Sequence, residues 1–114
     1  MSVLRKFREL REMGNKTVIR DGNTDTKRFF ALDASVYKDG AIDSKTKEML
    51  GLIASMVLLC DDCIKYHLIR CKEEGVTKEE FYELFNIALV AGGSVIIPHI
   101  RRAAMFLDEL KNDE

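Results

Sequence analysis

The segment from Leu50 to Leu59 places the strongest constraint on the fold, because apolar side chains cover every face of the helix that it would form. A helix that is apolar on all sides has to be buried on all sides. A chain of 114 residues can form one domain with its own core. Burial on every side of a helix in so small a protein requires other subunits as well, so the segment predicts a homo-oligomer. It is far shorter than the roughly 20 residues that span a bilayer, and we expect no membrane partner.

The rest of the chain shows apolar residues at helical spacing, separated by turn signals, and no alternating pattern typical of strands. This pattern predicts an all-α, single-domain helical bundle. The expected helices cover residues 3–13, 29–37, 44–59, 61–74 and 78–90, followed by a last helix that reaches Leu110.

Several residues have the chemistry of helix caps at these boundaries. Asp43 or Ser44 can cap the helix that contains the apolar segment. Thr77 and Glu80 have the spacing of a capping box, in which each side chain bonds to a backbone N–H group of the other residue. Ser94 can cap the last helix.

The N-terminal part of the chain contains a polar stretch. Gly14-Asn15 is a plausible helix stop, and residues 16–27 are polar, with a turn signal at Asp21-Gly22-Asn23. We therefore expect residues 1–24 to form an N-terminal helix followed by a polar loop. Residues 25–114 are expected to form the helical core, within one domain overall.

Net charge and cysteine content limit which partners and which cellular compartment we expect for this chain. The formal net charge is −1, which gives no indication of a nucleic-acid partner. We see no secretory signal at the start, and three cysteines are too few for a secreted disulfide scaffold. We therefore expect a cytoplasmic protein. In that reducing compartment, a C-x-x-C motif is more often catalytic or metal-binding than structural.

The motif with the clearest chemical meaning is Cys60-Asp61-Asp62-Cys63, followed by His67. Side chains three, four and seven residues apart share one face of a helix, so the thiols can bridge and the imidazole lies on the same side. Cys60 lies at the expected helix start, where backbone N–H groups stabilise a thiolate. His67 can accept a proton from a thiol, directly or through one water. The combination favours a redox-active dithiol over a small buried cysteine and a core histidine, which are the commoner roles of each residue alone.

Zinc binding is the main chemical alternative, because Cys71 adds a fourth possible ligand to the same helix. A tetrahedral zinc site needs all its donors about 2.0 to 2.3 Å from one point. On a straight helix Cys60 and Cys71 lie roughly 16 Å apart, so one subunit cannot bring both to one ion. We expect no metal and no cofactor within a subunit, while a site shared between subunits stays open. Cys71 is then a spare thiol.

Two further residues have only weak patterns around them. Glu48 is the last acid before the apolar segment, and its position alone indicates a carboxylate stabilised by the helix dipole. His99 is expected near the start of the last helix, facing solvent or a subunit contact.

Glu48, eleven intervening residues and the pattern Cys60-x-x-Cys63-x-x-x-His67 resemble the active site of alkylhydroperoxidase D-like proteins in the carboxymuconolactone decarboxylase superfamily. The order of segments over about residues 25–110 is similar as well. The resemblance implies an all-helical fold that assembles as a homotrimer or homohexamer. It also implies a thiol-dependent peroxidase or disulfide reductase that acts on a hydroperoxide or disulfide and is recycled by an external dithiol. In such a protein Glu48 joins His67 and the two cysteines in a proton relay.

The motif departs from the family pattern at one position. Some relatives have a histidine directly before the second cysteine, where this chain has Asp62 next to Asp61. Two acids beside a dithiol disfavour the thiolate, which weakens the expectation of strong peroxidase activity. Two alternatives therefore stay open. One is a helical homo-oligomer with a redox-sensing or vestigial dithiol, and the other is a non-redox, decarboxylase-like enzyme that uses His67 as its base.

Overall fold

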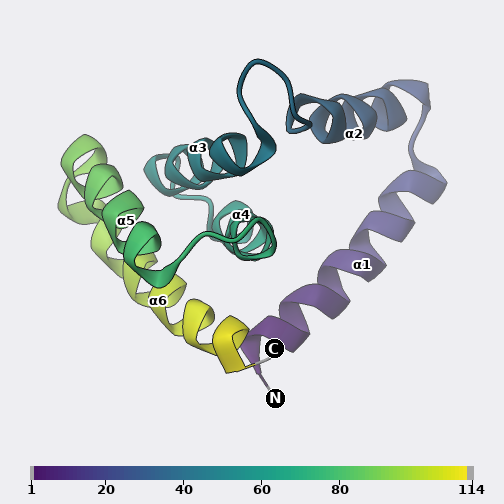
Figure 1. Ribbon diagram of the computed structural model, residues 1–114. Helices are drawn as coiled ribbons and strands as arrows, with labels where there is room; N and C mark the ends of the chain where they lie inside the picture. Colours follow the sequence, from purple (N-terminus) through teal and green to yellow (C-terminus); the bar gives the residue numbers. More distant parts are fainter. Residues whose placement is uncertain (1, 113–114) are drawn as a thin grey trace. The chain divides into compact units, whose positions relative to one another are not determined.

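The computed structural model describes residues 2–112, and every regular element in that range is helical (Figure 1). The all-α fold predicted from the sequence is therefore confirmed. Within the same residues, no helix combines the length and the apolar character needed to cross a membrane. The elements are α1 (Val3–Asp21), α2 (Thr24–Val36), α3 (Ser44–Val57), α4 (Asp61–Glu73), α5 (Lys78–Gly92), the short 3-10 helix η1 (Ser94–Ile96) and α6 (Ile97–Asn112).

Contacts divide the chain into two compact units, Met1–Lys38 and Asp39–Glu114. The first unit holds α1 and α2, and the second holds all the later helices. The sequence instead places α2 with the core, because the expected division falls at residue 24. That division of the chain stays a prediction.

The first helix is longer than predicted. It continues through Gly14 and Asn15 to Asp21, so the expected stop is wrong and much of the expected polar loop is helical. A glycine inside a helix costs only about 1 kcal/mol. That cost is partly offset by surface ion pairs, such as Lys16 with Glu12 one turn earlier at 3.1 Å.

The second helix also starts earlier than predicted. Gly22 follows the last residue of α1, and Asn23 then caps α2 by accepting a hydrogen bond from the Thr26 N–H group at 3.1 Å. As a result α2 begins at Thr24, whereas the apolar pattern alone placed its start at Phe29.

The second unit is built around α3, which packs against both α4 and α5, while α6 packs on α4. These helices and η1 each contribute to one buried core. The largest fully buried apolar side chains are Leu52, Met56, Ile64, Leu68, Phe81, Phe85, Ile96 and Phe106.

The apolar segment in and after α3 is only half covered by its own chain. Leu52 and Met56 are fully buried, whereas Leu50 is 53 % exposed and Leu58 is 77 % exposed. The exposed side is the one that the sequence assigns to contacts between subunits. The assembly itself stays a prediction.

Two helix caps in the second unit are confirmed. Asp43 caps α3 by accepting a hydrogen bond from the Thr46 N–H group at 2.8 Å. Thr77 and Glu80 form the capping box of α5, with hydrogen bonds of 3.2 Å and 2.9 Å to each other's backbone. Each of these bonds lies within one helical turn, which is why the sequence could predict them.

The start of the last helix differs from the prediction. Ser94 is the first residue of η1 instead of the cap of the last helix, and α6 begins only at Ile97. Ile96 is fully buried. It lies so close to Gly92 that a Cβ atom added to the glycine would be 2.7 Å from the isoleucine side chain. The tighter 3-10 turn thus brings Ile96 into the core before α6 begins.

The end of α3 is a backbone turn that leads directly to the first cysteine of the motif. The Leu59 N–H group bonds to the Met56 carbonyl at 3.1 Å. The Cys60 N–H group bonds to the Ser55 carbonyl at 3.0 Å, which completes a Schellman turn. Leu59 occupies its left-handed position with φ 60°, a place that Gly75 fills at the end of α4 with φ 89°. For a residue with a side chain, that conformation costs roughly 1 to 2 kcal/mol.

We expect Leu59→Gly to be more stable than Leu59→Ala by about 1 kcal/mol, because both remove the leucine side chain and only alanine keeps a Cβ atom at positive φ. At Leu58, where φ is −79°, the order should reverse, since glycine only adds conformational entropy to the unfolded chain there. Free energies of unfolding from denaturant titrations measure both pairs. The same order at the two positions would contradict the strain assigned to Leu59.

Candidate active site

Cys60 and Cys63 form a disulfide at the start of α4, with their Cα atoms 5.3 Å apart. Cys60 caps the helix, and its Sγ atom accepts a hydrogen bond from the Cys63 N–H group at 3.2 Å. The first cysteine therefore lies at the helix start, as predicted, where N–H groups favour negative charge on sulfur. Cys60 is half-buried and Cys63 is exposed, so reagents in solution can reach the pair.

His67 and Glu48 meet inside the second unit and join α4 to α3. The His67 Nδ1 atom lies 2.8 Å from Oε1 of Glu48, and the side chains are 10 % and 2 % exposed. A carboxylate beside Nδ1 favours the tautomer whose proton is on Nδ1, so Nε2 is the basic nitrogen of the neutral ring. Spacing alone indicated only a carboxylate near a helix start, and this contact was implied by the family resemblance.

Arg70 holds the second oxygen of Glu48. Its Nε atom lies 3.5 Å from Oε2 of Glu48, and its Nη atoms reach Glu73 at 2.6 Å and Glu74 at 3.3 Å. The hydrogen bond with Glu73, and after it the charge of Glu48, raise the pKa of Arg70 above its usual value. The sequence analysis missed Arg70, although its position three residues after His67 places it on the same helix face.

A second histidine contacts the residue that directly follows Cys60. The His99 Nδ1 atom is 2.7 Å from Oδ1 of Asp61, and the Arg102 Nε atom is 3.0 Å from Oδ2. His99 thus faces α4, instead of the solvent or subunit contact expected from the sequence. Its side chain is only 15 % exposed. Asp61 and His99 are 38 positions apart, so no local pattern could have predicted the contact.

Comparison with known proteins identifies the family. The sequence pattern of the carboxymuconolactone decarboxylase family matches residues 26–105. The chain belongs to this family. A relative from Paracoccus denitrificans, called uncharacterized protein 4 in the cox locus, is 31 % identical over 91 residues, which are 80 % of this chain and 82 % of the relative.

Solved structures agree with this membership. A carboxymuconolactone decarboxylase family protein from Thermotoga maritima, for which a role in an antioxidative response has been suggested, is 56 % identical with a TM-score of 0.89. The match covers 94 % of this chain and 91 % of that one. A family member from Legionella pneumophila is 24 % identical, with a TM-score of 0.79 over 96 % of this chain and 95 % of that one, and shows the fold alone.

The third cysteine of this carboxymuconolactone decarboxylase family protein is chemically separate from the pair. Cys71 is fully buried and forms no disulfide, as expected for a spare thiol. Burial, and after it the negative charge of Glu48, raise the pKa of Cys71 to about 12. Residues 2–112 contain no cluster of three or more His, Cys, Asp or Glu side chains that could hold a metal ion.

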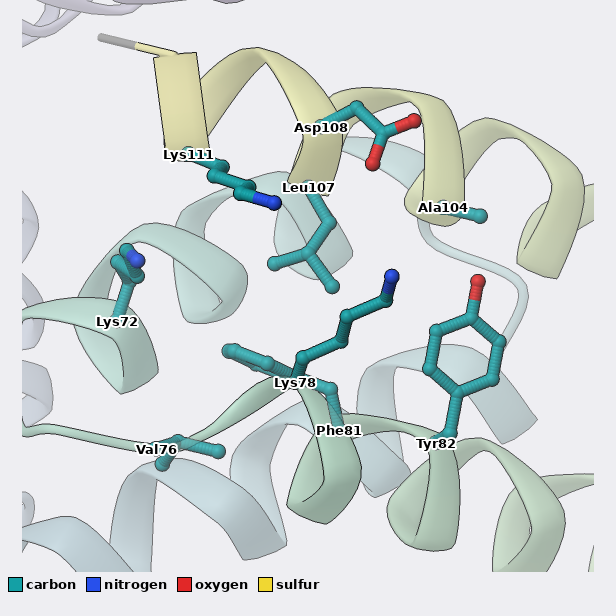
Figure 2. A pocket seen from close by; sticks show the side chains of 9 residues that line it. All are labelled: Lys72, Val76, Lys78, Phe81, Tyr82, Ala104, Leu107, Asp108 and Lys111. Atoms are coloured by element: carbon teal, nitrogen blue, oxygen red, sulfur yellow. The ribbon is translucent and has the colours of Figure 1, made fainter. Parts of the chain in front are cut away.

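A pocket of about 190 Å³ lies at the far end of α4 from the disulfide (Figure 2). It is lined by the end of α4, the start of α5 and the second half of α6, and in Figure 2 the Lys78 and Lys111 side chains lie on either side of Leu107. Lys72 at this end of α4 is twelve positions from Cys60, or about 18 Å along a helix. A ligand in this pocket therefore does not touch the sulfur atoms.

We expect Glu48→Ala to lower the free energy of unfolding by about 3 kcal/mol, because it leaves the buried imidazole of His67 and the guanidinium of Arg70 without their shared acceptor. Glu83→Ala is a matched control at an exposed position of α5, where a change within about 0.5 kcal/mol is expected. Denaturant titration measures both variants. Equal effects would contradict the importance of the Glu48 contacts.

At pH 8 the reduced, native protein should take up two alkyl groups from iodoacetamide, at Cys60 and Cys63. The third should enter only after unfolding, because with a pKa of about 12 the Cys71 sulfur stays a protonated thiol at that pH and only the thiolate attacks. Intact-mass measurements with and without denaturant count the groups. Rapid labelling of Cys71 in the native protein would contradict its burial.

Proposed function

We propose that this chain is a thiol-dependent oxidoreductase that cycles Cys60 and Cys63 between dithiol and disulfide, with His67 and Glu48 moving the protons. The observation that carries the proposal is the disulfide at the start of α4, four residues before a histidine whose ring is held by a buried carboxylate. Family membership supports it. The antioxidative role suggested for the Thermotoga maritima protein supports it further.

The oxidative half of the cycle consumes one hydroperoxide. One thiolate attacks the terminal peroxide oxygen, so that an S–O bond forms, the O–O bond breaks and an alcohol leaves after taking up a proton. The second thiol then attacks the sulfenic acid, which forms the S–S bond and releases water. An external dithiol reduces the disulfide by exchange and becomes a disulfide itself. Each turnover thus converts a hydroperoxide and a dithiol into an alcohol, water and a disulfide.

His67 is placed to act as the base in this cycle. On α4 it lies one turn after Cys63, the spacing at which side chains are neighbours. Glu48 holds the Nδ1–H group, so Nε2 can take a proton from a thiol. The imidazolium that results is stabilised by the same carboxylate, and Arg70 keeps that carboxylate in place through its other oxygen.

The two acids of the motif differ in their surroundings. Asp61 has two partners, the Arg102 guanidinium at 3.0 Å and the His99 imidazole at 2.7 Å. The positive charge of Arg102 offsets the negative charge of Asp61, so Asp61 repels a thiolate less than an unpaired carboxylate would. Asp62 is exposed, where water screens it. These contacts reduce the repulsion that the sequence predicts for a thiolate, and they favour catalysis over a vestigial dithiol.

The proposal includes an assembly and a compartment. Leu50 and Leu58 on and after α3 and Val90 on α5, which is 89 % exposed, are apolar side chains that a homotrimer or homohexamer would cover. The reducing conditions of the cytoplasm would return the disulfide to the dithiol after each turnover.

Turnover of a hydroperoxide with a dithiol donor tests the proposal. Cys60→Ser and Cys63→Ser should each abolish it, and His67→Asn should slow it about a hundredfold. Cys71→Ala is the matched control, because Cys71 is buried and outside the disulfide, and it should keep the activity. Activity that survives both serine variants would favour a non-redox enzyme, and oxidation without recycling would favour a redox sensor.

A further inference from the structure

Two histidine–carboxylate contacts involve residues close to the dithiol in the sequence. His67, which contacts Glu48, lies four residues after Cys63, and Asp61, which contacts His99, directly follows Cys60. The family resemblance covers only the first contact. The second connects α6 to the first residue of α4, directly after the cysteine that caps the helix.

The Asp61 contacts fix which charges stand beside Cys60. The Nδ1 atom of His99 lies 2.7 Å from Oδ1 of Asp61 and 3.3 Å from an Nη atom of Arg102, and the Arg102 Nε atom lies 3.0 Å from Oδ2 of Asp61. The His99 side chain is 15 % exposed and that of Asp61 is 36 %, so both are partly shielded from water. With His99 neutral, the aspartate and the arginine cancel. With His99 protonated, the group carries one net positive charge, centred on the residue that directly follows Cys60.

We propose that His99 is a positioning residue for the dithiol, which acts through Asp61 and Arg102 to set the charge beside Cys60. This inference rests on the proposed redox cycle of the Cys60–Cys63 pair. A positive charge near a thiol favours the thiolate. Protonation of His99 and ionisation of Cys60 therefore promote each other, since such coupling is reciprocal. When the disulfide forms, the negative charge on sulfur is lost and His99 binds its proton less tightly.

The charged groups near His99 come from its own helix and from α4. On α6, an Nη atom of Arg102 lies 3.3 Å from the His99 Nδ1 atom. η1, which packs against α6, spans Ser94–Ile96 and contributes no titratable side chain. From α4, Lys65 lies one turn after Asp61, and Asp62 is the neighbouring acid. Of these side-chain types, only the imidazole has a reference pKa between pH 6 and 8.5.

The test is the rate at which iodoacetamide alkylates Cys60 in the reduced, full-length Cys63→Ser protein. His99→Asn keeps an N–H donor for Asp61 but does not titrate. At pH 6 it should lower the rate roughly three- to tenfold, the effect of one charge at close range in a screened setting. At pH 8.5, which is well above the reference pKa of an imidazole, the two rates should agree. A purely structural role for His99 would change the rate by the same factor at both values.

Arg102→Gln provides a second, independent variant. Loss of its charge should slow alkylation at both pH values, while Arg101→Gln, the adjacent exposed arginine on α6, should leave the rates unchanged. An unaltered ratio of rates at pH 6 and 8.5 in His99→Asn, or equal effects of the two arginine variants, would overturn the inference.

The outcome is separable from that of the proposed function. Alkylation needs no substrate, so the coupling between His99 and Cys60 can be measured even if the protein shows no peroxidase turnover. Conversely, the protein could show turnover that requires both cysteines, while His99→Asn leaves the ratio of alkylation rates at pH 6 and pH 8.5 unchanged. That result would support the proposed function and contradict the role of His99.

Discussion

The buried contact between Glu48 and His67 is the interaction on which the rest of the site depends. It joins α3 to α4 at 2.8 Å, and both side chains are almost fully buried. A buried charged group that loses its partner is strongly destabilising, so the pair persists only while the two helices stay packed. The orientation of the His67 imidazole therefore depends on the packing of α3 against α4. Arg70, on the outer oxygen of the carboxylate, adds a second link between the same helices.

The connection between α3 and α4 limits movement in the same way. Cys60 is both the last residue of the turn that ends α3 and the cap of α4, so no flexible loop separates the two helices. The left-handed conformation of Leu59 is a cost of joining them so closely. Because the connection is so short, it fixes the position of Cys60 relative to α3, the helix that carries Glu48.

Local signals explain which parts of this structure the sequence could predict. The caps at Asp43 and Thr77 bond within their own first turn, so their residues are visible as short patterns. Gly14 was misleading because the interior of a helix tolerates a glycine at about 1 kcal/mol. The contact between Asp61 and His99 joins residues 38 positions apart, and spacing carries no information about such a pair. For the same reason Glu48 entered the site only through the family resemblance.

The sulfur that caps α4 gives this helix an unusual property. Most caps are hydroxyl or carboxylate oxygens, whose electronic state does not change during the life of a protein. Here the acceptor of the Cys63 N–H group is the Cys60 sulfur, which under the proposed cycle alternates between disulfide and thiolate and accepts better as a thiolate. Under that proposal, the cap of α4 is stronger in the dithiol form than in the disulfide form.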